Sequence, residues 1–197
     1  MNEQFYDSVL NIKTGGIQKG FHTSVNYHRY EPTPYSALEK LFLEYELSEN
    51  DRVVDFGCGK GRLIFYTHYR FRTTVVGIEM DEKLYQDASD NRTRYLKRSK
   101  SGGGHIHLHH CLAEEYSIDP SDNRFYFFNP FTIQIFRKII SSILKSVETS
   151  KRDVELVLYY PSPDYINFLE DSTPFTLKEE LIEKPNSNDR FLIYELV

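Results

Sequence analysis

The stretch that decides the fold runs from Asp55 to Arg62 and reads DFGCGKGR. It follows a short apolar, β-branched run and leads into a segment whose apolar residues, including Leu63 and Tyr66, have helical spacing. Glycines at alternate positions allow a tight turn and let a ligand approach the backbone closely. The helix that follows offers free N–H groups and a positive dipole end to an anionic group. The sequence therefore predicts a ligand site at this strand–turn–helix.

Two acidic residues accompany the turn, Asp55 before its first glycine and Glu79 at the end of the next predicted strand. A dinucleotide fingerprint counted from Gly57 would need a glycine where Arg62 stands, so the G-x-G-x-x-G pattern fails. A carboxylate at Asp55 would repel a pyrophosphate and attract an amino group, whereas Glu79 can accept hydrogen bonds from ribose hydroxyls. The pattern favours a nucleoside that carries an amino acid over NAD. The plainer alternative is a strand–turn–helix that uses glycines only to turn.

Strand and helix patterns alternate along the rest of the chain. Apolar or β-branched strands are predicted at residues 52–56, 73–78, 105–111, 124–128, 154–160, 176–183 and 191–196. Alternating strands and helices indicate a parallel sheet covered on both faces, and the short connection between the last two strands permits only an antiparallel pair. We expect an α/β fold with a doubly wound, mostly parallel sheet of about seven strands and a terminal antiparallel strand. Ligands of such sheets bind beyond the carboxyl ends of the strands.

The composition is that of an ordinary globular domain. The chain has 197 residues, 24 Lys plus Arg against 29 Asp plus Glu, and a formal net charge of −5. An acidic balance argues against a protein held on nucleic acid mainly by phosphate attraction. The start is not a signal sequence, and the longest weakly charged run, 125–136, is too short to cross a bilayer. We expect a cytoplasmic protein, with a loop-rich N-terminal extension (1–31) before one domain (32–197).

At these motifs the sequence resembles the class I S-adenosylmethionine-dependent methyltransferases, a Rossmann-like family, from about Tyr30 to Val197. The resemblance implies S-adenosyl-L-methionine as cofactor, with its amino group at Asp55 and its ribose at Glu79. After the third strand the family often has an acid for the adenine amine; Cys111 or Leu112 stands there, and Glu114 can substitute. The cofactor-binding residues that the resemblance implies are Thr33, Tyr35, Asp55, Gly57, Cys58, Gly59, Gly61, Arg62, Glu79, Met80, Leu112, Ala113 and Asn129.

The segment before the first long helix has two compatible interpretations. In related enzymes that methylate amino groups, a similar Thr-Pro segment closes over the cofactor, which implies contacts from Thr33 and Tyr35. The local alternative is a helix start, with Thr33 as the N-cap and Pro34 at the first helical position.

The predicted catalytic residues follow the fourth and fifth strands: Asn129, Pro130, Phe131 and Tyr160. The first three resemble the Asn-Pro-Pro-aromatic motif of enzymes that methylate adenine, cytosine or glutamine amides, with one proline missing. A side-chain amide and a backbone carbonyl can accept hydrogen bonds from an amine, while Phe131 can stack on a planar group and Tyr160 can wall the pocket. The plainer alternative is a strand end followed by a helix.

We therefore predict an S-adenosylmethionine-dependent methyltransferase that acts on a nitrogen, or another nucleophile, of a small molecule or a protein side chain. One alternative is a nucleic-acid amine methyltransferase aided by the basic segment 92–100, and another is a non-catalytic cofactor-binding module. No metal site is predicted. His105, His107 and His109 alternate along one strand, which sets them roughly 6–7 Å apart, too far to share one ion easily.

Overall fold

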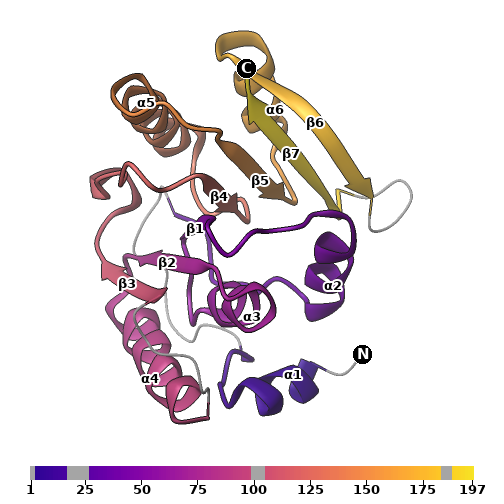
Figure 1. Cartoon of the computed structure of the whole chain (residues 1–197), viewed down its shortest axis with the longest axis vertical. Helices are drawn as coiled ribbons and strands as arrows, with labels where there is room; N and C mark the ends of the chain where they lie inside the picture. The colour runs from indigo at the N-terminus through magenta and orange to yellow at the C-terminus, as the bar shows by residue number, and fades with distance from the viewer. Residues whose placement is uncertain (1–2, 17–26, 99–104, 183–187) are drawn as a thin grey trace.

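The structure is a computed structural model that describes residues 3–16, 27–98, 105–182 and 188–197 (Figure 1). At its centre lies a seven-stranded sheet in the order β3-β2-β1-β4-β5-β7-β6. β7 is antiparallel to both of its neighbours, and the other pairs are parallel. The predicted fold class is thereby confirmed. The strands are β1 (Arg52–Phe56), β2 (Thr74–Glu79), β3 (Ile106–His110), β4 (Arg124–Phe127), β5 (Glu155–Tyr159), β6 (Phe175–Ile182) and β7 (Arg190–Leu196).

Helices cover both faces of the sheet (Figure 1). Successive strand residues point to opposite faces, so Val53 of β1 packs in the core beneath one helical layer and Val54 in the core beneath the other. The first layer holds α1 (Glu3–Leu10), α2 (Tyr35–Glu44), α3 (Arg62–Phe71) and α4 (Glu82–Arg98). The second holds the 3₁₀ turn η2 (Ala113–Glu115), α5 (Ile133–Thr149) and α6 (Pro163–Ser172).

Two local features differ from the sequence-based expectations. The segment expected to be rich in loops begins with helix α1, whose Leu10 is fully buried. Thr33 does not cap α2, which starts at Tyr35 after Pro34 without a side-chain cap. The Thr33 hydroxyl instead lies 2.8 Å from the Tyr126 hydroxyl, because a buried hydroxyl needs a partner inside the protein. Asp81, in contrast, does accept from the Leu84 N–H at the start of α4, as a capping residue would.

None of the helices in the described part of the chain is long and apolar enough to cross a membrane. The same residues contain no group of three side chains that could hold a metal ion. Two histidines at the ends of β3 have local contacts: Nδ1 of His105, just before the strand, lies 3.1 Å from the Thr74 hydroxyl, and Nε2 of His110, its last residue, lies 3.1 Å from the Met80 carbonyl oxygen.

Candidate cofactor and acceptor site

The glycine turn bends away from the carboxyl end of β1 and is tied to β2. The N–H groups of Gly57 and Cys58 both donate to the Ile78 carbonyl, at 2.9 and 3.0 Å. Gly57 has φ +81° and Gly59 has φ +54°, in the left-handed region that favours glycine. A side chain at Gly57 would approach Cβ of Pro130 to 2.9 Å. The turn therefore touches the loop after β4, where the acceptor residues were predicted.

Asp55, the last-but-one residue of β1, has a buried carboxyl group. Its residue exposure is 5%, and no described residue donates a hydrogen bond to the side chain. Burial, and then the negative charge of Glu79, raise the pKa of Asp55 to about 8. A buried carboxyl without a donor is unfavourable unless a ligand supplies one. Its place at the switch between β1 and β4 is where sheets of this kind bind ligands.

Glu79 fixes the same turn from the end of β2. One carboxylate oxygen accepts from the Gly59 N–H and the other from the Asp81 N–H, both at 2.8 Å. Burial raises the pKa of Glu79, and these backbone hydrogen bonds oppose the rise. Because each carboxylate oxygen has two acceptor sites, Glu79 can hold the turn and still accept further hydrogen bonds.

The carboxyl ends of β2 and β3 continue the site. The Cys111 N–H donates to the Glu79 carbonyl at 3.2 Å, which holds these two strand ends together. Beside them, the His110 ring lies within hydrogen-bond distance of the Met80 carbonyl oxygen. The same ring stacks on Tyr85, with ring centroids 5.1 Å apart. Met80 was predicted to contact the cofactor, whereas His110 and Tyr85 were not singled out.

The turn η2 presents a donor next to an acceptor. The Ala113 N–H donates to the Tyr27 hydroxyl at 3.0 Å, and this hydroxyl donates to the Glu114 carboxylate at 2.5 Å. Leu112 stands immediately before η2. Leu112 and Ala113 therefore lie beside Tyr27 at this turn, and their contact with a cofactor stays a prediction. Sequence reasoning missed Tyr27.

The loop after β4 carries an unsatisfied amide. Asn129 has φ +40°, and its side-chain oxygen is buried without a partner among the described residues. His28 covers the neighbouring backbone: its Nδ1–H donates to the Asn129 carbonyl at 2.5 Å, and its N–H donates to the Pro130 carbonyl at 2.8 Å. The amide oxygen of Asn129 is thus an acceptor in need of a donor.

Phe131 does not have the position that the sequence predicted for an acceptor platform. Its ring is 0% exposed and packs edge-on against Tyr27, at a centroid distance of 5.7 Å. In this arrangement it cannot stack on an acceptor, because it belongs to the core beneath α5. Tyr160 fits its predicted place better: it follows β5 with φ +51°, is 45% exposed and contacts Tyr159.

Several predicted cofactor contacts point their side chains into the protein. The Arg62 guanidinium lies 4.4 Å from the Tyr35 ring and donates to the Thr14 hydroxyl at 2.8 Å and to the Thr33 carbonyl at 3.1 Å. Burial, followed by the charge of Asp55, raises the pKa of the Cys58 thiol, so it stays protonated. At these positions only the backbone is well placed to contact a cofactor.

Tyr30 is a further residue that sequence reasoning missed. Its ring lies directly against Gly59, leaving no room for a side chain there, and its hydroxyl donates to the Thr14 carbonyl at 2.7 Å. The run of aromatic and basic residues at 27–30 was the available signal. Its position on the glycine turn depends on long-range packing, which one sequence does not reveal.

Comparisons with known proteins point to one fold. No protein-family model and no curated protein matches the chain. Among solved structures, a putative RNA methyltransferase from Pyrococcus horikoshii superposes with a TM-score of 0.64 at 19% identity and covers 100% of both chains. An RNA methyltransferase from Salinibacter ruber, solved with S-adenosyl-L-homocysteine, gives 0.59 at 16% identity, covering 84% of this chain and 92% of its own. The chain has the fold of class I methyltransferases.

A third structure agrees with these two. An S-adenosylmethionine-dependent methyltransferase from Aquifex aeolicus gives a TM-score of 0.57 at 17% identity and covers 81% of this chain and 89% of its own. The likeness is one of fold. In this structure the glycine turn, Asp55 and Glu79 lie at the carboxyl ends of β1 and β2, the edge at which doubly wound sheets bind ligands.

Proposed function

We propose that the chain is an S-adenosylmethionine-dependent methyltransferase that acts on a nitrogen, or another nucleophile, of a small molecule or a protein side chain. The observation that carries this proposal is the buried carboxyl of Asp55 beside the glycine turn, which has no donor of its own. An α-amino group is a cation with several donors, and a buried carboxylate favours such a partner strongly. The pyrophosphate of a dinucleotide would instead lie against the carboxyl groups of Asp55 and Glu79, whose negative charge repels it.

The residues present fit this cofactor. Asp55 would hold its amino group, Glu79 would accept from its ribose, and Ala113 and Glu114 offer a donor and an acceptor for the adenine edge. When bound, S-adenosylmethionine supplies a methyl group made electrophilic by its sulfonium. The protein's own contribution is binding and alignment, which is the main requirement of an in-line displacement.

The acceptor would meet the loops after β4 and β5. Asn129 offers a buried amide oxygen that can accept from an N–H and so orient the nitrogen lone pair. Tyr160 supplies a partly exposed aromatic wall on the next strand. This pairing suits a nitrogen with a hydrogen to donate, and the proposal for a nitrogen acceptor rests on it.

RNA is the second candidate acceptor, because one of the structures named above is described as an RNA methyltransferase and another as a putative one. The basic side chains of α4 give this candidate little support. Arg94 lies 4.0 Å from Asp90, and Arg98 donates to the Ser8 carbonyl at 2.8 Å. A labelled-methyl screen over amines, proteins and RNA distinguishes the two candidates.

Calorimetry tests whether the protein binds the proposed cofactor. We expect micromolar binding of S-adenosylmethionine and S-adenosylhomocysteine and no binding of NAD. Asp55→Ala and Glu79→Ala should each abolish binding, whereas Asp171→Ala, which removes an exposed acid on α6, should leave it unchanged. Wild-type affinity in both site variants would refute the assignment.

The acceptor loop is tested by Asn129→Ala. On whichever acceptor the screen finds, this variant should transfer methyl groups about 100-fold more slowly, because the nitrogen loses its orienting partner. Calorimetry with S-adenosylhomocysteine, run in parallel, separates a lost acceptor contact from a lost cofactor site. Full activity of Asn129→Ala would remove Asn129 from the mechanism.

A further inference from the structure

The segment 27–30 of this chain lies on three parts of the site at once. The Tyr27 hydroxyl is hydrogen-bonded to the Ala113 N–H and to the Glu114 carboxylate at η2. His28 covers the backbone of the Asn129 loop, and the Tyr30 ring lies on Gly59. These are the nucleobase end, the acceptor loop and the glycine turn of the proposed function. One short stretch of chain therefore occupies groups that ligands would need.

The Tyr27 hydroxyl both accepts and donates a hydrogen bond at η2. Its hydroxyl oxygen accepts from the Ala113 N–H, and its hydroxyl hydrogen is donated to the Glu114 carboxylate. The Watson–Crick edge of adenine offers the same pair, an acceptor at N1 and a donor at the exocyclic amine. Burial, followed by the hydrogen bond to Glu114, raises the pKa of Tyr27, so the phenol keeps the proton that it donates.

The ring of Tyr27 adds to the likeness. It packs edge-on against Phe131, with centroids 5.7 Å apart, and so fills the space beside a core aromatic as a planar base would. A backbone bridge between Tyr27 and Phe131 and the His28 N–H on the Pro130 carbonyl hold the segment in place. None of these contacts belongs to the ladders of the seven-stranded sheet.

We infer that Tyr27 is an internal stand-in for adenine: its phenol occupies the donor–acceptor pair of Ala113 and Glu114 and must leave when S-adenosylmethionine binds. This inference rests on the proposed function and goes beyond it by making the segment 27–30 a competitor of the cofactor. Its consequence is that the apparent cofactor affinity of the wild-type chain is weaker than the intrinsic affinity of the open site.

The test compares Tyr27→Phe with the wild type by calorimetry, using S-adenosylhomocysteine as the probe. Phenylalanine keeps the ring against Phe131 but frees the Ala113 N–H and the Glu114 carboxylate, so we expect binding to become about tenfold tighter. Tyr27→Ala should tighten it at least as much. Tyr69→Phe, which removes a hydroxyl from a half-exposed tyrosine on α3, is the matched control and should change nothing.

A second ligand distinguishes competition by the Tyr27 phenol from a general loosening of the site in the variants. S-Inosylhomocysteine carries a 6-oxo base whose edge has the reverse donor and acceptor, so it should bind weakly to every variant and gain nothing from Tyr27→Phe. Glu114→Gln should narrow the preference for the adenine compound over the inosine compound. Hydrogen exchange at the Ala113 amide should be faster in Tyr27→Phe than in the wild type.

The outcomes distinguish this inference from the proposed function. If the wild type and Tyr27→Phe bind S-adenosylhomocysteine equally, or if Tyr27→Phe binds it more weakly, the function stands and the phenol is no competitor. If neither binds it, the cofactor assignment itself fails. Equal gains for the adenine and inosine compounds would also overturn the inference.

Discussion

The glycines of the turn each lie against another part of this chain. Side chains at these positions would meet Pro130 at Gly57, Tyr30 at Gly59 and Phe65 at Gly61. Packing and backbone conformation therefore already account for them. Asp55 is different, because nothing in the described protein compensates for its buried carboxyl. At the scale of single residues, that acid distinguishes a ligand site from a plain turn better than the glycines do.

The proposed binding of S-adenosylmethionine should depend on pH through Asp55. With a pKa of about 8 in the free protein, the carboxyl is mostly protonated at pH 6, whereas a bound ammonium group requires the carboxylate. Binding should therefore release a proton and strengthen by up to about tenfold per pH unit between pH 6 and 8. Calorimetry with S-adenosylhomocysteine in buffers of different ionisation enthalpy measures both effects. Asp55→Asn should bind weakly at every pH, and a flat wild-type profile would contradict the prediction.

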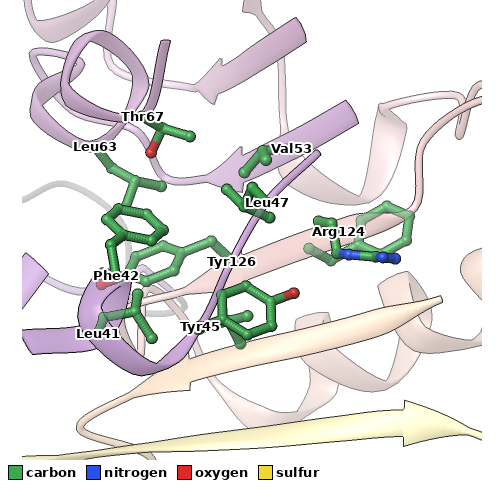
Figure 2. A pocket seen from close by; sticks show the side chains of 11 residues that line it. Leu41, Phe42, Tyr45, Leu47, Val53, Leu63, Thr67, Arg124 and Tyr126 are labelled. Carbon is green, nitrogen blue, oxygen red and sulfur yellow. The ribbon is translucent and has the colours of Figure 1, made fainter. Parts of the chain in front are cut away.

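Thr67 of α3 is a second residue with a buried polar group that lacks a hydrogen-bond partner among the described residues. Its hydroxyl is fully buried, has no partner among the described residues and borders an apolar cavity of about 20 Å³ between α2, α3 and the sheet (Figure 2). Thr67→Val has nearly the same shape and removes the unpaired group, so it should stabilise the fold by about 1 kcal/mol and raise Tm by about 2–4 °C. A lower Tm in thermal unfolding would instead indicate a water in the cavity that bonds the hydroxyl.

At the scale of elements, the sheet could be predicted because its strands are short, apolar runs between turn signals. Helix α5 could be predicted because it is 17 residues long and its buried side chains, from Ile135 to Ile143, have helical spacing. Helix α1 could not, because its eight residues are too few to show a period. A different limit explains why the positions of Tyr27 and Phe131 could not be predicted. Strand ends can be read from a sequence, whereas the segment that folds back over them is placed by contacts with residues about a hundred positions away.

The N-terminal elements are tied down through Arg62. Its guanidinium pairs with Glu3 of α1 and donates to the Thr14 hydroxyl and the Thr33 carbonyl, at 5% exposure. Arg62→Ala should lower the free energy of unfolding by about 2 kcal/mol, because it removes these bonds and leaves buried acceptors unpaired. It should also speed amide exchange in α1. Glu3→Ala should cost less, since the Glu3 side chain is 47% exposed, and an equal cost would contradict this account.

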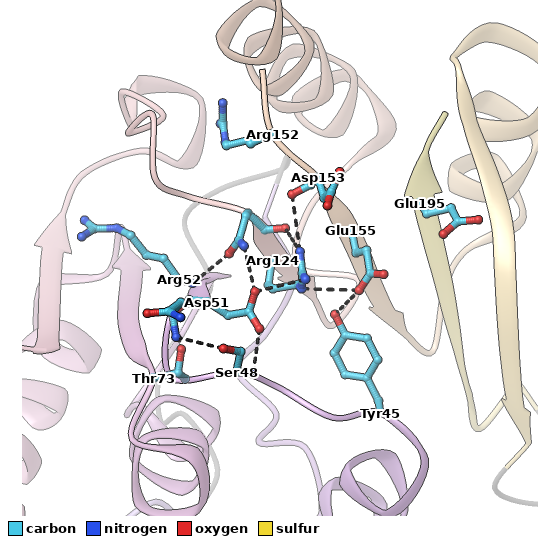
Figure 3. Close-up of polar contacts among 12 residues, drawn as sticks. Tyr45, Ser48, Asp51, Arg52, Thr73, Arg124, Arg152, Asp153, Glu155 and Glu195 are labelled. Atoms are coloured by element: carbon cyan, nitrogen blue, oxygen red, sulfur yellow. Dashed lines mark hydrogen bonds and ion pairs between the residues drawn. The ribbon is translucent and has the colours of Figure 1, made fainter. Parts of the chain in front are cut away.

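At the scale of the whole molecule, the candidate site and a charged network lie at opposite ends of the sheet. The amino ends of β4 and β5 and the start of β1 are joined by a charged network (Figure 3). Arg124 lies 3.1 Å from Asp51 and 3.4 Å from Glu155, and Glu155 also accepts from the Tyr45 hydroxyl at 2.6 Å and pairs with Lys178 of β6. The candidate site follows the carboxyl ends of the same strands.

The network predicts a stability effect that leaves binding untouched. Burial alone would raise the pKa of Glu155, but the bonds from Lys178 and Tyr45 and the charge of Arg124 outweigh it and hold the pKa below its usual value. An acid with a lowered folded pKa stabilises the protein above the unfolded pKa, and this contribution is lost as pH falls through the folded pKa. Glu155→Gln should therefore lower the free energy of unfolding by about 2 kcal/mol at pH 7, and the gap to wild type should close in acid.

Urea unfolding at several pH values measures that gap, and calorimetry with S-adenosylhomocysteine measures the site. Glu195→Gln is the matched control: its side chain is 45% exposed and lies 3.9 Å from Lys178, so it should cost less than about 0.5 kcal/mol. Binding should be unchanged in both variants, because Glu155 begins β5 and Glu195 of the antiparallel β7 pairs with it, at the end of the sheet opposite the candidate site. A gap that stays constant as the pH is lowered well below the usual pKa of a glutamate would contradict the stabilising role of the Glu155 carboxylate. A weakened affinity in Glu155→Gln would show that the two ends of the sheet are not independent.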